Sequence, residues 1–132
     1  MELTGKVVTG ARQAAAFTQL DWVREQCAEK LGFQPFPGTL NLKIVAEDFA
    51  LLAELKGTKG PELQPTDPNF CVATVLPIQI ESHQGAVVIP AQEVDIHRGN
   101  ILEIISAVNL RRTLVLKDGD PVTVRYLIPP TA

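Results

Sequence analysis

Long apolar runs, an excess of basic charge and a cysteine framework are all missing from this chain of 132 residues. Its apolar runs are far too short to cross a bilayer, and its first six residues lack the apolar core of a signal peptide. A net charge of −3 gives no general attraction to nucleic acid or to an anionic membrane. We therefore expect a single cytoplasmic domain over residues 1–132 that binds neither nucleic acid nor membrane.

Cysteines and the familiar catalytic motifs are equally scarce. Cys27 falls on the apolar stripe of a predicted helix and Cys71 in a predicted apolar strand, so we expect two buried thiols rather than a disulfide or a cysteine metal site. The chain contains no Walker loop, no His-Glu-x-x-His, no Cys-x-x-Cys and no Gly-x-Ser-x-Gly sequence. The candidates that remain are separate polar residues.

The most informative stretch is residues 32–42, which read Gly-Phe-Gln-Pro-Phe-Pro-Gly-Thr-Leu-Asn-Leu. Pro35 and Pro37 restrict the backbone and remove two hydrogen-bond donors, and Gly38 can adopt a conformation that is closed to other residues. Together they predict a fixed turn, which the chain leaves as a strand.

The strand after this turn has two different faces. Successive side chains point to opposite sides, so Leu40, Leu42 and Ile44 share one face while Thr39 and Asn41 share the other. We expect the apolar face to point inward, which leaves a hydroxyl and an amide about 7 Å apart at the Cα level. The pair is either an oxygen site for a ligand or a cap for the turn.

Helical signals are few. Residues 18–31 carry apolar side chains at helical spacing: Leu20, Val23, Cys27 and Leu31. Thr18 and Asp21 resemble a capping box, and Gly32 stands where a C-terminal cap belongs. A shorter helix is predicted over residues 47–55. The loop that follows, 56–69, is rich in glycine and proline and is either a mobile lid or a surface excursion.

The remaining elements are short strands. Besides the strand that starts at Thr39, they are predicted over residues 3–8, 70–80, 86–89, 101–105, 114–116 and 122–127, with turns at 82–85 and 117–121. Pro77 argues for an edge position or a bulge in its strand. With about six strands, one good helix and short connections, a closed or nearly closed β-barrel is the natural way to hide the strand edges. The predicted fold class is therefore mainly β.

Two further polar features stand out, and each has a plain structural alternative. Glu103 is alone among isoleucines and leucine in its strand, where it lines a pocket or faces water. Arg111 and Arg112 form a basic pair that binds a ligand or is simply solvated.

The chain resembles a known family, and this resemblance favours the ligand-binding alternatives. The segment Leu-Gly-Phe-Gln-Pro-Phe-Pro-Gly-Thr-Leu-Asn-Leu-Lys at 31–43 resembles the signature of the archaeal CTP-dependent riboflavin kinases. Further blocks resemble the same family in the same order, at 75–78, 85–90, 101–105, 110–111 and 116–120. The resemblance implies a six-stranded cradle-loop (RIFT-like) barrel with one main helix. It also implies transfer of the CTP γ-phosphate to the riboflavin 5′-hydroxyl, giving FMN and CDP, and we expect a monomer.

The resemblance also assigns roles to residues. Thr39 and Asn41 would hold Mg²⁺; because both are neutral, the metal would arrive with nucleotide phosphates. Glu103 would contact the flavin and is a candidate catalytic base. The nucleotide would be bound by two segments, made of Gly10, Ala11, Arg12, Gln13, Ala14 and Ala15 in the first and Val108, Asn109, Leu110 and Arg111 in the second.

One segment departs from the family. Its members carry a Gly-x-Gly-x-Gly type loop after the first strand, and only the first glycine of that loop remains in residues 10–17. Arg12 either blocks close phosphate approach or supplies the charge that backbone amides otherwise provide. The alternative function is therefore a non-catalytic flavin- or nucleotide-binding barrel. A DNA-binding relative is disfavoured by the acidic charge and the lack of a helix-turn-helix.

Overall fold

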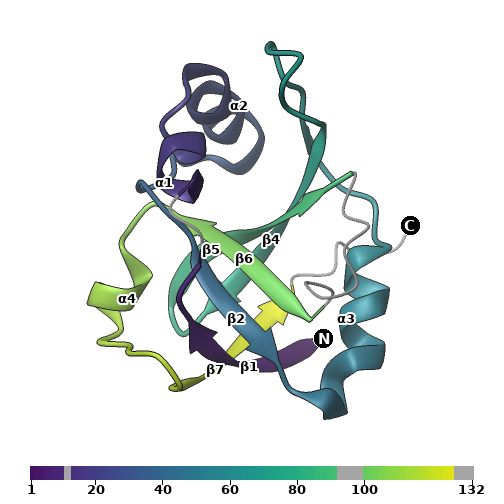
Figure 1. The fold of residues 1–132 in the computed structure, drawn as a ribbon, viewed down its shortest axis with the longest axis vertical. Helices are drawn as coiled ribbons and strands as arrows, with labels where there is room; N and C mark the ends of the chain where they lie inside the picture. Colours follow the sequence, from purple (N-terminus) through teal and green to yellow (C-terminus); the bar gives the residue numbers. More distant parts are fainter. Residues whose placement is uncertain (11–12, 92–99, 127–132) are drawn as a thin grey trace.

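The computed structural model describes residues 1–10, 13–91 and 100–126, apart from the side chains of residues 13 and 14. Seven strands are present in this part of the chain: β1 (Glu2–Val8), β2 (Leu40–Ile44), β3 (Glu62–Leu63), β4 (Ala73–Ile80), β5 (His83–Pro90), β6 (Ile101–Ser106) and β7 (Pro121–Tyr126). Six of them run in the order β4-β5-β6-β2-β1-β7, and β7 pairs back onto β4. Every pairing is antiparallel, so the predicted closed six-stranded barrel is confirmed (Figure 1).

The barrel interior is filled by one face of each strand. Leu40, Leu42 and Ile44 are all buried in it, as the alternation in β2 predicts. Closure is made by two residue pairs, Ile78 with Tyr126 and Gln79 with Arg125. The outer face of β2 is left for other contacts.

Helices cover parts of the outer surface. They are α1 (Gln13–Thr18), α2 (Asp21–Leu31), a 3₁₀ turn (Ala46–Asp48), α3 (Phe49–Lys56) and α4 (Leu110–Thr113). The longest, α2, packs a buried stripe against a second apolar cluster on the outside of β4, β5 and β6, and α3 lies across the barrel from it (Figure 1). None of the helices in the described residues is long and apolar enough to cross a membrane.

The start of α2 differs from the prediction, whereas its end agrees. The N-cap residue is Leu20, and no side chain caps the helix, so the predicted Thr18–Asp21 capping box is wrong. Thr18 is instead the last residue of α1, and its hydroxyl bonds with Ala15 O and Gly38 N. Gly32 is the C-cap, with φ of 82° and its N–H donated to Ala28 O and Cys27 O.

The predicted strands also differ from the structure at the β4–β5 hairpin, after α4 and before β4. The turn predicted at 82–85 is wrong: β4 and β5 are joined by Glu81 and Ser82 alone, with Glu81 at φ 55°, and the pairing already begins at Ile80 with His83. The strand predicted over 114–116 is a loop after α4, in which Val115 is 86% exposed at φ 52°. Residues 70–72 precede β4, and the last residue of the strand predicted to end at Leu127 lies outside the described part.

The prediction of free thiols is confirmed, whereas the strand position and burial predicted for Cys71, and the edge position or bulge predicted for Pro77, are wrong. Both cysteines are free thiols; Cys27 is fully buried, which raises the pKa of its thiol to about 11, and Cys71 is half-buried in the loop before β4. Pro77 lies inside an uninterrupted β4–β5 register. The register shows no bulge, and β4 is not an edge strand, because β3 and β7 pair on its other side. Val75 N donates to Pro61 O on that other side, so the nitrogen of Pro77, two residues on, faces it between the β3 and β7 pairings.

The loop over residues 56–69 is fastened to α2. The side-chain amide of Gln26 donates to Gln64 O at 2.7 Å and accepts from Gln64 N at 2.7 Å, and Lys30 Nζ donates to Glu62 O. Leu63 is fully buried beneath these contacts. These bonds favour a surface excursion over a lid.

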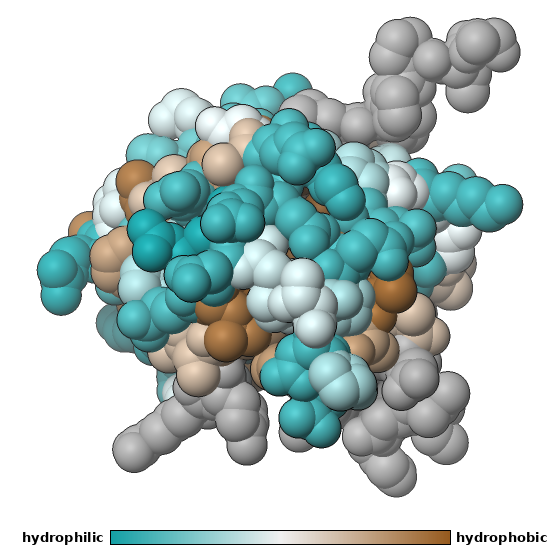
Figure 2. Space-filling view, turned by 90° about the horizontal axis from the view of Figure 1, so that it is seen from above, coloured by the Kyte–Doolittle hydropathy of each residue, from teal (hydrophilic) through white to brown (hydrophobic). Residues whose placement is uncertain are grey.

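Seen from above, this face of the molecule is mainly hydrophilic, with apolar residues in small separate groups (Figure 2).

Candidate functional site

The turn before β2 is fixed at two of its backbone amides. Phe36 N donates to Ser106 O at 2.7 Å, which ties the turn to the end of β6. Gly38 N donates to Thr18 Oγ1 at 2.8 Å, which ties it to the end of α1. Gly38 itself has φ of 108°, a conformation that side chains with a Cβ rarely adopt, so the glycine is required there. The backbone that leads into the next residue, Thr39, is therefore fixed.

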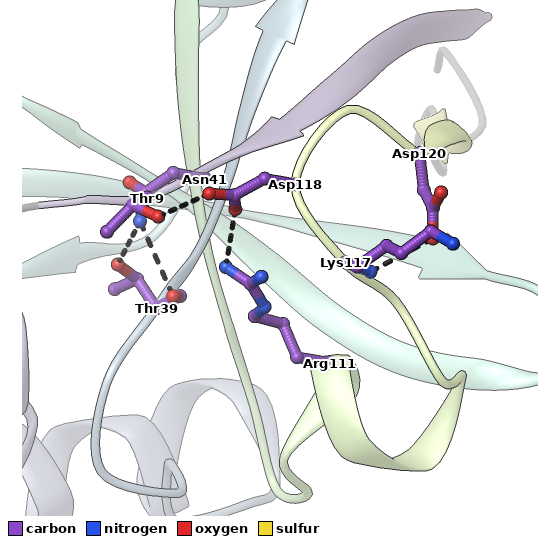
Figure 3. A network of polar contacts seen from close by, with 7 residues as sticks. All are labelled: Thr9, Thr39, Asn41, Arg111, Lys117, Asp118 and Asp120. Carbon is purple, nitrogen blue, oxygen red and sulfur yellow. Dashed lines mark hydrogen bonds and ion pairs between the residues drawn. The ribbon is translucent and has the colours of Figure 1, made fainter.

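Thr39 and Asn41 lie together on the outer side of β2. Asn41 Nδ2 donates to Thr39 Oγ1 at 3.1 Å, and Asn41 is only 6% exposed (Figure 3). In the sheet register Asn41 stands between Val8 on β1 and Glu103 on β6. The predicted separation of the two polar residues from the apolar face is confirmed.

Gly10 packs directly on the Asn41 amide. A Cβ added at Gly10 would stand 2.0 Å from Asn41 Nδ2 and 2.6 Å from its Cγ, far closer than any real contact. A side chain at position 10 would therefore displace the Asn41 amide, whereas Gly38 is constrained by its backbone conformation. The end of β1 and the polar pair on β2 are in contact.

The Thr39–Asn41 pair fits a magnesium ion with few protein ligands. Neighbouring ligands of octahedral Mg²⁺ at about 2.1 Å are about 3 Å apart, and the Asn41 amide end lies 3.1 Å from the Thr39 hydroxyl. A half-turn of the amide brings its oxygen to that place. Within the described residues no cluster of three or more His, Cys, Asp or Glu side chains could hold a metal.

A pocket of about 190 Å³ opens beside the turn. One wall is the turn itself, another is the end of β6, and the third is the segment 108–111, which was predicted to contact nucleotide. The pocket thus brings Thr39 and Arg111 to a common space. Its lining residues are Phe36, Pro37, Gly38, Thr39, Leu40, Ile104, Ser106, Val108, Asn109, Leu110 and Arg111.

The members of the segment 108–111 contribute differently. Val108 is 37% exposed at the rim, whereas Leu110 is buried in the barrel core. Asn109 caps α4, with its Oδ1 accepting from Arg112 N at 3.1 Å. Arg111 Nη1 lies 3.0 Å from Asp118 Oδ1, while Arg112 is exposed and does not line the pocket.

Asp118 links Arg111 to the end of β1. Its other oxygen, Oδ2, accepts a hydrogen bond from Thr9 Oγ1 at 2.8 Å (Figure 3). The turn that carries Asp118 is itself bound to β1, because Gly119 N donates to Val7 O and Val7 N to Asp120 O. The Thr9 hydroxyl and then the Arg111 guanidinium hold the pKa of Asp118 below its ordinary value of 3.8. This exposed ion pair therefore orients Arg111 more than it stabilises the fold.

Glu103 does not line the pocket. It lies on the outer face of β6, half-exposed, directly opposite Asn41 on one side and Val88 on the other. Asn41 is therefore next to Thr39, which lines the pocket, and next to Glu103, which does not. Of the first predicted nucleotide segment, Ala11 and Arg12 lie outside the described residues. Gln13, Ala14 and Ala15 begin α1, and the carbonyl of Ala15 accepts from the Thr18 hydroxyl.

Sequence reasoning missed Thr9, Thr18, Ser106 and Asp118. The Asp-Gly step at 118–119 signals a tight turn, which is confirmed, but nothing local to it announces Thr9 or Arg111 as partners. Thr18 has the spacing of a helix cap, and its partner Gly38 is 20 residues away. In each case the missing information is a contact between distant segments.

The pKa of Asp118 gives a direct test of this network. We expect carboxyl NMR titration to place it below 3.8, and Thr9→Val to raise it toward that value, because the Thr9 hydrogen bond is the largest cause of the shift. Since the folded-state pKa is lowered, the stability that the ionised carboxylate contributes is present above 3.8 and is lost as pH falls through the folded-state pKa. Thr9→Ser, which keeps the hydroxyl, is the control. A parent pKa of 3.8, or one that Thr9→Val leaves in place, contradicts the arrangement.

Comparison with known proteins identifies relatives across most of the chain. A riboflavin kinase of Archaeoglobus fulgidus is 35% identical over 131 residues, covering 97% of this chain and 55% of the relative. One of Pyrobaculum aerophilum is 36% identical, covering 97% and 61%, and one of Saccharolobus solfataricus is 33% identical, covering 97% and 75%. The chain thus spans little more than half the length of the first two relatives.

A family model agrees with these relatives. It is the model CTP-dep_RFKase, described as domain of unknown function DUF120, and it matches residues 7–126. The match runs from the end of β1 to the end of β7 and so includes the turn, the pocket and the Asp118 network. The chain belongs to the CTP-dep_RFKase family.

Proposed function

We propose that this chain is a CTP-dependent riboflavin kinase, which transfers the γ-phosphate of CTP to the riboflavin 5′-hydroxyl and gives FMN and CDP. The observation that carries the proposal is the pocket that has Thr39, partner of Asn41, on one wall and Arg111 on another. A site for a metal–nucleotide complex needs both oxygen ligands and a cation for phosphate. The named relatives, all riboflavin kinases, support this reading.

In this proposal Thr39 and Asn41 bind Mg²⁺ together with nucleotide phosphates. Neither side chain carries charge, so the phosphates must supply the negative charge that offsets the dication. When bound, the ion would neutralise charge that develops on the transferred phosphoryl group. The protein's own part is to hold the two oxygens at a fixed separation, which the held turn and the contact with Gly10 favour.

Arg111 is the proposed partner of the phosphates in the pocket. Asp118 contacts its guanidinium at Nη1, and the Arg111 side chain remains 39% exposed, so its other donors can reach a ligand. Guanidinium donors suit phosphate oxygens because several N–H groups point in one plane. The apolar rim, formed by Phe36 and Val108, offers partly exposed surface to the less polar part of the nucleotide.

Glu103 is the proposed flavin contact. Its place opposite Asn41, outside the nucleotide pocket, would put the acceptor hydroxyl and the donor phosphate on two sides of the Thr39–Asn41 pair. Such a carboxylate accepts hydrogen bonds from the flavin, and it is the candidate general base for the hydroxyl proton.

The proposed enzyme is a cytoplasmic monomer.

Product formation tests the function. Purified protein is incubated with riboflavin, Mg²⁺ and each nucleoside triphosphate in turn, and FMN is measured by chromatography. We expect FMN with CTP above all others, and loss of turnover in Asn41→Ala with the thermal transition of the parent kept, because the change removes a ligand and leaves Leu40 and Leu42 in the core. Riboflavin or nucleotide binding without FMN in the parent would instead favour the non-catalytic binding barrel.

Glu103→Gln tests the flavin contact separately. Loss of a hydrogen bond to a charged acceptor should weaken riboflavin binding by about tenfold to a hundredfold and leave nucleotide binding nearly unchanged. Riboflavin fluorescence quenching and nucleotide calorimetry measure the two affinities. Glu54→Gln on α3 is the control. An unchanged riboflavin affinity, or an equal loss for both ligands, would count against the assignment.

A further inference from the structure

The end of α1 holds the turn through one hydroxyl. Thr18 Oγ1 donates to Ala15 O at 3.0 Å and accepts from Gly38 N at 2.8 Å, and the side chain is fully buried. One hydroxyl therefore joins the segment that follows β1 to the residue directly before Thr39. A buried backbone N–H without an acceptor is costly, so this bond restricts where the turn can lie.

The other end of the same segment also rests on the polar pair. Gly10 leaves no space between the backbone and the Asn41 amide, as the 2.0 Å clearance for a Cβ shows. Residues 10 and 18 thus contact the turn and strand from two sides, one at Asn41 and one at the amide before Thr39. Residues 11–15, which lie between them, belong to the segment predicted to contact nucleotide.

We infer that Thr18 is a positioning residue for the Thr39–Asn41 pair, and that it couples the nucleotide segment after β1 to the magnesium ligands. The inference rests on the proposed function. Thr18 contacts neither phosphate nor metal. By accepting the hydrogen bond from Gly38 N, it fixes the backbone that precedes Thr39 and so the position of the Thr39 hydroxyl. Gly10 packs against the Asn41 amide and so limits the orientations that this amide can adopt. Metal binding and nucleotide binding are thereby linked through the protein as well as through the phosphates.

A merely structural role for Thr18 makes a different prediction. A structural hydroxyl would affect unfolding and all ligands alike, whereas a positioning hydroxyl affects the part of nucleotide affinity that depends on Mg²⁺. The chain offers a matched comparison: Thr58 also donates its hydroxyl to a helix carbonyl, Glu54 O at 2.9 Å, at the end of α3. Helix α3 is on the other side of the molecule from α1 in the view of Figure 1.

The experiment compares Thr18→Val, Thr18→Ser and Thr58→Val with the parent. CTP affinity is measured by calorimetry with Mg²⁺ and with chelator, together with the Asn41 side-chain amide signals of the ligand-free protein by NMR. For Thr18→Val we expect shifted Asn41 signals, a roughly five- to tenfold loss of CTP affinity with Mg²⁺, and little change with chelator, since one hydrogen bond is lost. Thr18→Ser and Thr58→Val should match the parent.

Gly10→Ala provides a second variant should Thr18→Val fail to fold. Its Cβ displaces the Asn41 amide from the other side, so the same selective loss of Mg²⁺-dependent affinity is expected. Equal losses with and without Mg²⁺ in these variants, or unmoved Asn41 signals in them, overturn the inference while leaving the proposed function intact. A parent that binds no CTP under either condition overturns the proposed function, and the inference with it.

Discussion

Two hydrogen bonds to backbone amides, Phe36 N to Ser106 O and Gly38 N to Thr18 Oγ1, determine how the rest of the site is arranged. Proline at 35 and 37 restricts the backbone around them, and Gly38 makes the sharp change of direction at φ 108°. Because Thr39 follows at once and β2 begins at Leu40, the held turn sets the position of the whole strand end. The pocket exists because this turn, β6 and the segment 108–111 meet there.

The strand β2 serves the core and the site at the same time. Its inner residues are among the most buried in the barrel, and its outer face carries Asn41 between Val8 and Glu103. Strand alternation allows this because each face can change without the other. The barrel therefore supplies rigidity, and the loops around its outer face supply charge: Arg111 from α4 and Asp118 from the turn before β7.

Much of this architecture follows from local sequence pattern. The burial of Leu40, Leu42 and Ile44, the helix ending at Gly32 and the Asp-Gly turn each depend on neighbouring residues, so they could be predicted. The hairpin at Glu81 was misplaced because Gly85, which resembles a turn residue, lies instead in β5, where a Cβ would stand 2.8 Å from Ile105 O. The roles of Thr18 and Asp118 depend on partners far along the chain, and no periodicity reveals such pairs.

The central claim is that Thr39 and Asn41 form a magnesium site that is complete only with nucleotide phosphates. Its most direct test is a Mg²⁺ titration followed through the Asn41 side-chain amide signals, once without nucleotide and once with saturating CTP. Two neutral ligands are too few to dehydrate Mg²⁺ alone, so the account predicts little change without CTP and a saturating shift with it. Saturation at the same low Mg²⁺ concentration in both titrations, or no shift in either, would contradict it.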